Sequence, residues 1–454
     1  MERLLDHFYG RERILREIVT GVLTVPQAAS FSLVGAKLIG KSRLLDFLAA
    51  EDGPLLGDEW EAWRPPQFRE SGRVVVLKID CDWRDAQSAF LTYVADRVEQ
   101  HLREVERIPL DWVALEQQPG ASRRLWEMSR RLNQLRYRLV LLMDNFDSVF
   151  TDQLLTPESM DELRPLTREL ALVVATEQPL HDLDRDLAAS PLFNVMTQLI
   201  LGLLEPDAAR RWLGDTATRY PALTPLLDDF LTLTGGHPFL LRRVADIIVE
   251  LQNMPAPDRP LGQEHLPLLR LRLAEHGRLL FVTYWRLLQD PPPRIDTRIL
   301  VPLLKQLIQG HVALTQTARE HIPTLNWLIN QGMVVYDEQG YRLFSPLLAE
   351  FLANRLSGVT MPAPPRAADK PESAIFADLT KIEAALLRYF LAHSNEVVSH
   401  EQLLADVWKR PDASPRRVQE AIRRLRLQLD QAMPPVGTIE NDRGRGYRFV
   451  PAAP

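Results

Sequence analysis

The octapeptide GAKLIGKS at residues 35–42 leaves few folds open to this sequence. It fits the spacing G-x-x-x-x-G-K-[ST], and an apolar run precedes it while a helix-like segment follows. In this pattern the glycines Gly35 and Gly40 let backbone N–H groups turn toward a phosphate. Lys41 then reaches the β- and γ-phosphates, and the hydroxyl of Ser42 binds Mg²⁺. The sequence therefore predicts a nucleotide-binding loop between a strand and a helix, with ATP or ADP and Mg²⁺ as the expected ligands.

Short apolar runs alternate with longer segments of helical periodicity in the N-terminal part of the chain. This alternation is typical of a parallel sheet that is covered by helices on both faces. We therefore predict an α/β P-loop NTPase domain for residues 1–205. The runs expected to form its strands are residues 31–34, 74–79, 139–143, 172–176 and 199–203.

The third apolar run ends in an acidic residue, Asp144. This is the Walker B arrangement, in which the carboxylate holds Mg²⁺ through water. The next residue is Asn145, whose amide cannot accept a proton as a general base. Asp147 is the nearest substitute for a catalytic acid, although a cap of a helix or turn is at least as good an interpretation. The sequence thus predicts Mg²⁺ at Ser42 and Asp144 and leaves ATP hydrolysis open.

Two further segments carry a family resemblance. The sequence YGRE at residues 9–12 resembles the motif that opens STAND ATPases (signal-transduction ATPases with numerous domains) and related AAA+ proteins. In that family the segment contacts the base or ribose, which implies such contacts for Gly10 and Arg11. Thr176 matches the family's polar side chain that senses the γ-phosphate. Asn145 departs from the family pattern.

The sequence GGHP at residues 235–238 resembles the Gly-x-Pro motif of the helical lid in the same family. The resemblance implies that Pro238 packs near the nucleotide. It makes Arg242 and Arg243 candidates for a second phosphate sensor, and a solvent-exposed helix face is the alternative for both arginines. His237 is interpreted as a local structural residue rather than a phosphate sensor.

By the same resemblance, residues 206–256 form the helical lid and residues 257–357 form a winged helix. A hairpin around DEQG at residues 337–340 ends this segment. Its expected third helix, over residues 317–331, has no basic cluster, so we interpret it as a regulatory packing module rather than a DNA reader. Residues 358–374 contain four prolines and predict a semi-rigid linker.

The C-terminal segment concentrates positive charge on one expected helix. Residues 409–426 carry seven basic and two acidic residues, a local charge of +5, in a chain whose net charge is −6. Such a cluster suits a polyanion. The helix is expected over residues 414–429, with its apolar residues at helical spacing on the core side. These are Val418, Ile422, Leu425 and Leu429.

Residues 375–454 contain this helix, and residues 375–451 closely resemble the winged-helix effector domain of OmpR/PhoB-type response regulators. The matching pieces are Leu-Thr-x-x-Glu, Val-Val-Ser-x-Glu-Gln-Leu-Leu, Ile-Arg-Arg-Leu-Arg and Arg-Gly-x-Gly-Tyr-Arg-Phe. The resemblance implies that the basic helix enters the major groove of double-stranded DNA and that the wing reaches the minor groove. It implies base contacts from Arg416, Arg417, Gln419 and Glu420, phosphate contacts from Arg423 and Arg424, and wing contacts from Arg443 and Arg445.

The amino-acid composition excludes several classes of protein. The single cysteine, Cys81, excludes a disulfide framework and a cysteine-built metal cluster. No apolar run approaches the ~18 residues of a membrane span, so we expect a cytoplasmic protein without a membrane partner. Lysine is scarce, since only seven of the 54 basic residues are lysines.

These features support three functional hypotheses. The first is a nucleotide-gated, DNA-binding transcriptional regulator, in which the ATP or ADP state of the N-terminal domain controls the C-terminal winged helix. The second is an active ATPase that remodels or loads partners on DNA, and Asn145 argues against it. The third is a scaffold with structurally bound nucleotide. The family resemblance adds self-association that depends on nucleotide.

Overall fold

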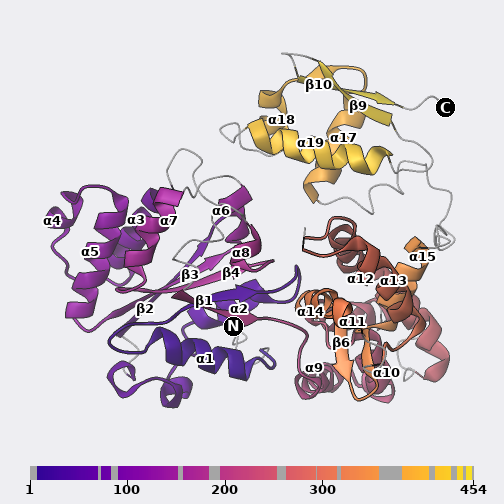
Figure 1. Ribbon diagram of the computed structural model, residues 1–454, viewed down its shortest axis with the longest axis horizontal. Helices are drawn as coiled ribbons and strands as arrows, with labels where there is room; N and C mark the ends of the chain where they lie inside the picture. The colour runs from indigo at the N-terminus through magenta and orange to yellow at the C-terminus, as the bar shows by residue number, and fades with distance from the viewer. Residues whose placement is uncertain are drawn as a thin grey trace. The chain divides into compact units, whose positions relative to one another are not determined.

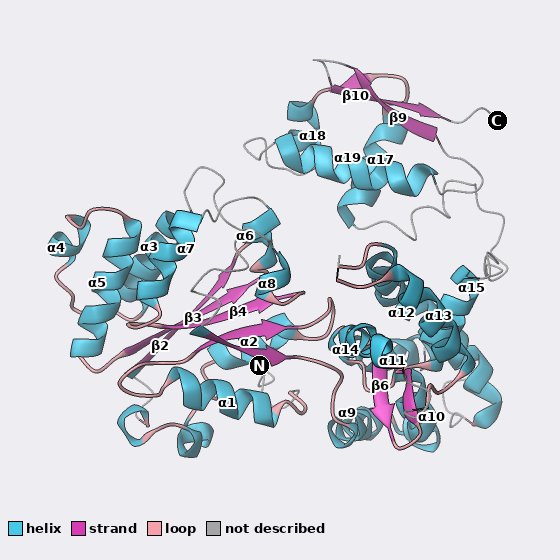
Figure 2. Ribbon diagram, viewed as in Figure 1, coloured by secondary structure: helices cyan, strands magenta, loops and turns pink. Residues whose placement is uncertain are grey.

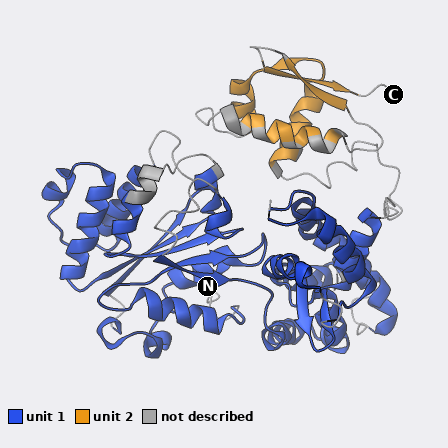
Figure 3. Ribbon diagram, viewed as in Figure 1, with its two compact units in different colours: residues 1–359 blue, residues 360–454 orange. Residues whose placement is uncertain are grey.

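The computed structural model divides the chain into two compact units, Met1–Val359 and Thr360–Pro454 (Figure 3). We describe each unit by itself. The described residues are 8–69, 73–82, 90–151, 157–183, 195–252, 262–292, 294–313, 318–356, 381–407, 415–430, 437–442 and 446–451.

A five-stranded parallel sheet forms the centre of the N-terminal part of unit 1 (Figures 1 and 2). Its order is β2-β3-β4-β1-β5, so the strand that precedes the phosphate loop lies between β4 and β5. The expected parallel α/β sheet is thereby confirmed. The strands are β1 (Ser30–Val34), β2 (Val74–Asp80), β3 (Arg138–Asp144), β4 (Ala171–Thr176) and β5 (Met196–Ile200).

The position predicted for the fifth strand was wrong by three residues. We expected residues 199–203, whereas β5 ends at Ile200. This strand is paired with β1 alone and is largely exposed, so its own sequence lacks the continuous apolar run of an inner strand. The apolar residues that follow leave the sheet and enter the core, beginning with the buried Leu201.

Helices cover both faces of the sheet (Figure 1). Alternate side chains of each strand point to opposite faces, so the apolar strands supply two separate cores. One core contains α1 (Glu12–Val22) and α2 (Lys41–Ala49), and the other contains α3 (Phe90–Gln100), α5 (Ala121–Gln134) and α7 (Pro157–Leu166). Short helices complete this part: α4 (Trp112–Glu116), α6 (Asp147–Thr151), α8 (Leu180–Leu183), the 3₁₀ helices η2 (Asp58–Trp63) and η3 (Pro66–Phe68), and the π-helix η5 (His101–Val105).

The described residues in the rest of unit 1 form helices, one hairpin and an isolated bridge between Val312 and Tyr341, and the hairpin follows helices as the sequence predicted. A single hydrophobic core joins the helices α9 to α15, which lie on both sides of the predicted boundary at residue 256. That boundary itself lies outside the described residues and stays a prediction. The helices are α9 (Pro206–Arg219), α10 (Leu227–Thr234), α11 (Pro238–Gln252), α12 (Leu266–Gln289), α13 (Thr297–Gln309), α14 (Ile322–Asn330) and α15 (Pro346–Leu356), with η7 (Pro221–Leu226), η8 (Gln263–His265) and η10 (Arg319–His321) between them.

The hairpin consists of β6 (Val334–Asp337) and β7 (Gly340–Leu343), and its turn is the predicted DEQG segment. The helix before it is shorter than the predicted 317–331. Its first turn is the 3₁₀ helix η10, and the α-helix begins only at Ile322, directly before Pro323 at the second helical position. A proline fits there because the first turn of a helix needs no backbone N–H from it.

The described residues of unit 2 form three helices and a three-stranded antiparallel sheet of order β8-β10-β9. A hydrophobic core lies between these helices and the sheet. The four apolar residues of the basic helix are buried in it, as predicted. The elements are α17 (Lys381–Ala392), β8 (Val397–Val398), α18 (His400–Asp406), α19 (Pro415–Asp430), β9 (Gly437–Asp442) and β10 (Gly446–Pro451). The predicted linker, residues 358–374, lies outside the described residues.

Within the part of the chain that the structure describes, no helix is both long enough and apolar enough to cross a membrane.

Candidate functional site

The phosphate-loop motif connects β1 to α2 at the carboxyl edge of the sheet. The backbone N–H of Gly35 donates to the carbonyl of Thr176, the last residue of β4, at 3.0 Å. Gly40 precedes α2 with φ +102°, a conformation that side chains other than glycine's rarely adopt. The glycine positions that the motif requires are therefore used for a close strand contact and for a left-handed turn.

Lys41 lies along its own loop. Its buried ammonium group donates to the carbonyls of Gly35 at 2.6 Å and Ala36 at 3.0 Å. Burial lowers the pKa of Lys41, and the nearby carboxylates of Glu177 and Asp147 oppose that effect. The motif thus brings a buried cation to the loop, surrounded by carbonyl and carboxylate oxygens.

Asp144 ends β3 next to the loop, and both of its carboxylate oxygens have partners. Oδ1 accepts the backbone N–H of Asn145 at 3.1 Å, and Oδ2 lies 3.1 Å from the Nζ of Lys78. Lys78 also contacts Asp46 of α2, at 2.5 Å. Burial lowers the pKa of Lys78, but its hydrogen bonds to Asp46 and Asp144 and their charges outweigh burial and raise the pKa overall.

Sequence reasoning did not assign Lys78 or Asp46 to the site. The available signal was a single charged residue in the otherwise apolar run VVVLKI. Lys78 has the same strand parity as Val74 and Val76, which face α2. A lysine at that position must lie under the helix that follows the phosphate loop.

Asn145 and Asp147 occupy the edge beside β2 and β4. Asn145 has φ +52°, and its amide donates to Asp80 at the end of β2, at 3.0 Å. Asp147 accepts the backbone N–H of Glu177 with both carboxylate oxygens, at 2.9 and 3.0 Å. Burial raises the pKa of Asp147 to about 6. Its role as a base stays a prediction, and its contact with Glu177 joins α6 to the end of β4.

The predicted metal ligands were Ser42 and Asp144. Hydroxyl and carboxylate oxygens suit Mg²⁺, which binds one or two carboxylates together with phosphate oxygens and water. Ser42 is exposed at the start of α2. Asp144, however, is buried and paired with Lys78, so the residues as folded do not fit a metal ion at Asp144. Among the described residues, no group of three or more His, Cys, Asp or Glu forms an alternative metal centre.

Gly10 and Arg11 fasten the N-terminal segment to the beginning of the helical part. The buried guanidinium of Arg11 donates to the carbonyl of Leu203 at 2.8 Å and to the carbonyl of Gly202. Gly10 has φ +68°, and a Cβ there would lie 2.8 Å from the Cβ of Ala208, so only glycine allows this approach. Burial lowers the pKa of Arg11 to about 10. The predicted contact of these residues with a nucleotide stays a prediction.

Thr176 ends β4 beside the loop and is fully buried. Its hydroxyl has no hydrogen-bond partner among the described residues. A buried hydroxyl without a partner costs about 1–3 kcal/mol. This cost fits the predicted role of Thr176 as a polar group kept for a ligand.

The segment 235–238 forms the corner between α10 and α11. His237 is completely buried and contacts the hydroxyl of Tyr284 at 3.2 Å, which fits the interpretation of His237 as a structural residue. Pro238 is the first residue of α11. Arg242 is exposed on α11, while Arg243 pairs with Asp246 at 2.7 Å. The phosphate-sensing role of Arg242 stays a prediction.

The phosphate loop is built into two of the cores of unit 1. Ala36 belongs to the core of the helical part, together with residues from α9 to α15. Ile39 belongs to the core between the sheet and α2. A Cβ on Gly332, just before β6, would lie 3.6 Å from the side chain of Ile39. The loop therefore contacts both the ATPase-like sheet and the segment that carries the first hairpin.

The basic helix α19 presents one face to solvent. Gln419 and Arg423 are exposed, and helix positions 416 and 420 share that face, opposite the buried residues. The described part of the structure does not include the side chains of Arg416, Arg417, Glu420 and Arg424. Two residues of the predicted wing tip, Arg443 and Arg445, also lie outside it.

Two other residues of unit 2 are structural. Arg426 donates to the carbonyl of Ile439 at 2.8 Å and lies over the ring of Tyr447, so it connects α19 to the hairpin. Tyr447 is buried in the core of unit 2, as expected of a packing residue.

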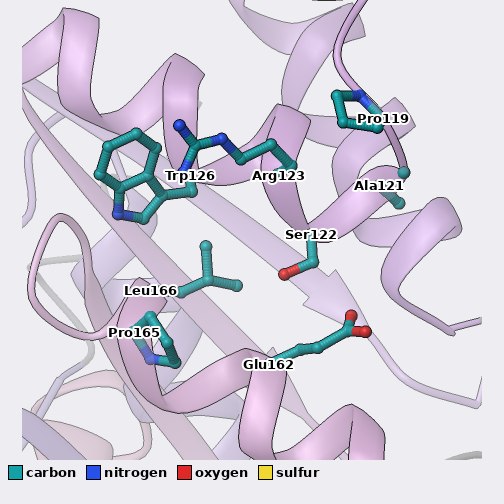
Figure 4. A pocket seen from close by; sticks show the side chains of 9 residues that line it. Pro119, Ala121, Ser122, Arg123, Trp126, Glu162, Pro165 and Leu166 are labelled. Carbon is teal, nitrogen blue, oxygen red and sulfur yellow. The ribbon is translucent and has the colours of Figure 1, made fainter.

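A hollow of about 520 Å³ lies elsewhere in unit 1, between α5 and α7 (Figure 4). At the edge of the hollow, the guanidinium carbon of Arg123 lies 4.3 Å from the centre of the Trp126 ring. None of its lining residues belongs to the phosphate loop or to the strand ends described above. It is lined by Pro119, Gly120, Ala121, Ser122, Arg123, Trp126, Glu162, Pro165 and Leu166.

Comparison with known proteins identifies the C-terminal segment. Residues 376–449 match the family described as "Transcriptional regulatory protein, C terminal". A search of curated protein sequences found no match.

Solved structures similar to unit 1 include the Walker-type ATPase PABY2304 of Pyrococcus abyssi, with a TM-score of 0.47 and 14% identity over 77% of this chain and 97% of that chain. The ORC2 protein of Aeropyrum pernix has a TM-score of 0.44 and 13% identity over 79% and 98%. Cdc6p of Pyrobaculum aerophilum has a TM-score of 0.30 and 15% identity over 78% and 96%.

The phosphate loop, the strand order and the position of Asp144 define the class of the N-terminal part. It has the fold of a P-loop NTPase. Residues 376–449 are a winged-helix domain of the transcriptional-regulator type. The chain thus combines an ATPase-like domain with the effector domain of a transcriptional regulator.

Proposed function

We propose that this protein is a transcriptional regulator in which the ATP or ADP state of the N-terminal domain controls DNA binding by the C-terminal winged helix. The observation that carries this proposal is the position of the phosphate loop in two cores. Ala36 and Ile39 are buried, so a loop that rearranges around a nucleotide must repack both cores.

Lys41 is the residue that starts the rearrangement. Its ammonium group is bound to the carbonyls of Gly35 and Ala36 and has to leave them to reach a phosphate. The carbonyl of Ala36 is then released from a charged partner beside the helical core. The other residues that we propose for nucleotide binding are Gly35, Gly40, Ser42 and Thr176.

The helical core supplies a route to the C-terminal domain. α15 is the last element of unit 1, and its buried residues Leu347, Leu348 and Leu352 lie in the same core as Ala36. The chain continues from α15 toward unit 2. A change in the packing around Ala36 therefore reaches the helix from which the C-terminal domain extends.

Double-stranded DNA is the proposed partner of unit 2. The family description of residues 376–449 supports this, and so does the exposed polar face of α19 with Gln419 and Arg423. The helix positions that share or border this face are those of Arg416, Arg417, Glu420 and Arg424. The predicted wing tip contains Arg443 and Arg445. We propose base contacts near the start of α19 and phosphate contacts further along it.

The proposal is tested by binding to genomic DNA fragments with ATP, with ADP and without nucleotide, at one fixed salt concentration. We expect DNA affinity to differ between the nucleotide states in the natural protein. Lys41→Ala should abolish nucleotide binding and make the DNA affinity the same in all three conditions. Arg416→Ala should weaken DNA binding by about 1–3 kcal/mol in every condition while nucleotide binding is unchanged.

The other hypotheses predict different results in the same samples. Steady ATP turnover stimulated by DNA indicates a remodelling ATPase, and nucleotide that neither exchanges nor alters DNA affinity indicates a scaffold. Equal DNA affinity in all nucleotide states contradicts gating. We also propose that self-association depends on the nucleotide, which light scattering on these samples measures.

A further inference from the structure

Lys78 places a partly buried positive charge beside the phosphate loop of the ATPase-like domain. It lies on β2, one of the strands beside β3, and is the only charged residue before Asp80 in that strand. Its neighbours of the same parity, Val74 and Val76, pack under α2. Lys78 therefore enters the layer between the sheet and the helix that begins at the phosphate loop.

Three oxygen atoms surround the ammonium group of Lys78. They belong to Asp46 at 2.5 Å, Asp144 at 3.1 Å and the backbone carbonyl of Ser42 at 3.5 Å. An ammonium group has three donors, and this arrangement offers an acceptor to each of them. One of the partners, the carboxylate of Asp144, is a ligand that the sequence assigned to a metal ion, whereas the contact with Ser42 involves its backbone carbonyl and not its hydroxyl.

A divalent cation beside Asp144 would compete directly with Lys78. A water of Mg²⁺ that binds Asp144 would have to share a carboxylate oxygen, because both oxygens of Asp144 already have partners. The ion itself is repelled by a nearby ammonium group. The side chain of Asp144 is only 5% exposed, so it has little room to turn away from Lys78. Asp46 also contacts Lys78 and lies one helical turn after Ser42.

We propose that the ammonium group of Lys78 is the resident cation of the nucleotide site, so that ATP and ADP bind with an affinity that depends little on Mg²⁺. Lys78 neutralises Asp144, whose negative charge would otherwise repel the phosphates. The inference rests on the proposed nucleotide binding and adds the cation that accompanies it.

The test measures the affinity of ADP and ATP by isothermal titration calorimetry, once in excess Mg²⁺ and once in EDTA. For the natural protein we expect the two dissociation constants to agree within about threefold. In Lys78→Met, which keeps the length of the side chain and removes its charge, affinity in EDTA should fall about tenfold or more and recover with Mg²⁺. Mn²⁺ binding in the presence of ADP, followed by electron paramagnetic resonance, should become tighter in the variant.

Two variants serve as controls. Lys305→Met removes an exposed lysine on α13 and should behave as the natural protein does. Lys78→Arg keeps the charge and should keep most of the independence from Mg²⁺.

The outcomes separate the two proposals. Loss of nucleotide binding by the natural protein in EDTA contradicts the role of Lys78 and leaves the proposed function standing, and this result does not require any variant to fold. Equal Mg²⁺ dependence in Lys78→Met and the natural protein also contradicts it. Absence of ADP and ATP binding in both buffers contradicts the proposed function and this inference together.

Discussion

Lys78 and His237 are basic side chains in buried surroundings, and their partners decide whether each one keeps a charge. Lys78 lies between two carboxylates, so its positive charge is compensated. His237 has a phenol and a backbone N–H as partners, and neither compensates a positive charge. Burial, together with the charge of Arg11, lowers the pKa of His237 to about 3.

The pKa of His237 predicts acid sensitivity of unit 1. The unfolded chain binds a proton below about pH 6.5 and the folded chain does not, so stability is fully present above that pH and falls as the pH is lowered toward 3. The loss amounts to about 1.4 kcal/mol for each pH unit in this window. Urea unfolding of His237→Gln should show a shallower pH dependence than the natural protein, although the variant is less stable at neutral pH.

His276→Gln is the matched control, because His276 is partly exposed on α12 and pairs with Glu250. It should leave the acid sensitivity of unit 1 nearly unchanged. An identical pH dependence in His237→Gln and the natural protein would show that another group causes the loss.

At the scale of secondary-structure elements, the corner between α10 and α11 depends on one glycine. Gly235 ends α10 with φ +53°, and a Cβ there would lie 1.9 Å from the carbonyl oxygen of Phe344, just after β7. The corner between α10 and α11 and the first hairpin therefore approach each other more closely than a side chain at position 235 permits.

We predict that Gly235→Ala destabilises unit 1 by more than about 2 kcal/mol, because left-handed strain and a backbone clash add. Thermal unfolding measures the effect. Gly214→Ala is the control, since Gly214 lies inside α9 with open space around it and alanine should stabilise that helix by up to about 1 kcal/mol. Similar melting temperatures for both variants would contradict the close approach as the cause.

The sequence was sufficient to predict the first four strands, β1 to β4, and the phosphate loop, because these depend on local periodicity and on glycine positions, whereas the edge strand β5 was misplaced. It was not sufficient to place Lys78, whose role follows from the pairing of β2 with β3 and from the packing of α2. The guanidinium of Arg11 is a second example, because its partners are carbonyls almost two hundred positions away. Contacts between elements distant in sequence leave little trace in local patterns.

At the scale of the whole molecule, the hydrophobic cores differ in the number of structural parts that share them. In unit 1 the phosphate loop, the helices α9 to α15 and the first hairpin share their cores, and unit 2 has a core that contains residues of its own elements. Binding of a ligand to unit 1 therefore stabilises the cores of that unit directly.

Differential scanning calorimetry of the full chain should show separate transitions for the two units. ADP at about 100 times its dissociation constant should stabilise unit 1 by about 2.7 kcal/mol and leave the other transition nearly unchanged. A fragment of residues 375–454 should unfold at the temperature of the ligand-independent transition. A single transition that ADP shifts as a whole would contradict the independence of unit 2.

The self-contained core of unit 2 has a consequence for how such chains diversify. A gene rearrangement that exchanges residues 360–454 for a different effector removes the whole of this core together with its elements. The helices α9 to α15 and the first hairpin, by contrast, could only be inherited together with the loop whose alanine they enclose. Variation among relatives should therefore concentrate at the tail, while everything before it is passed on as one piece.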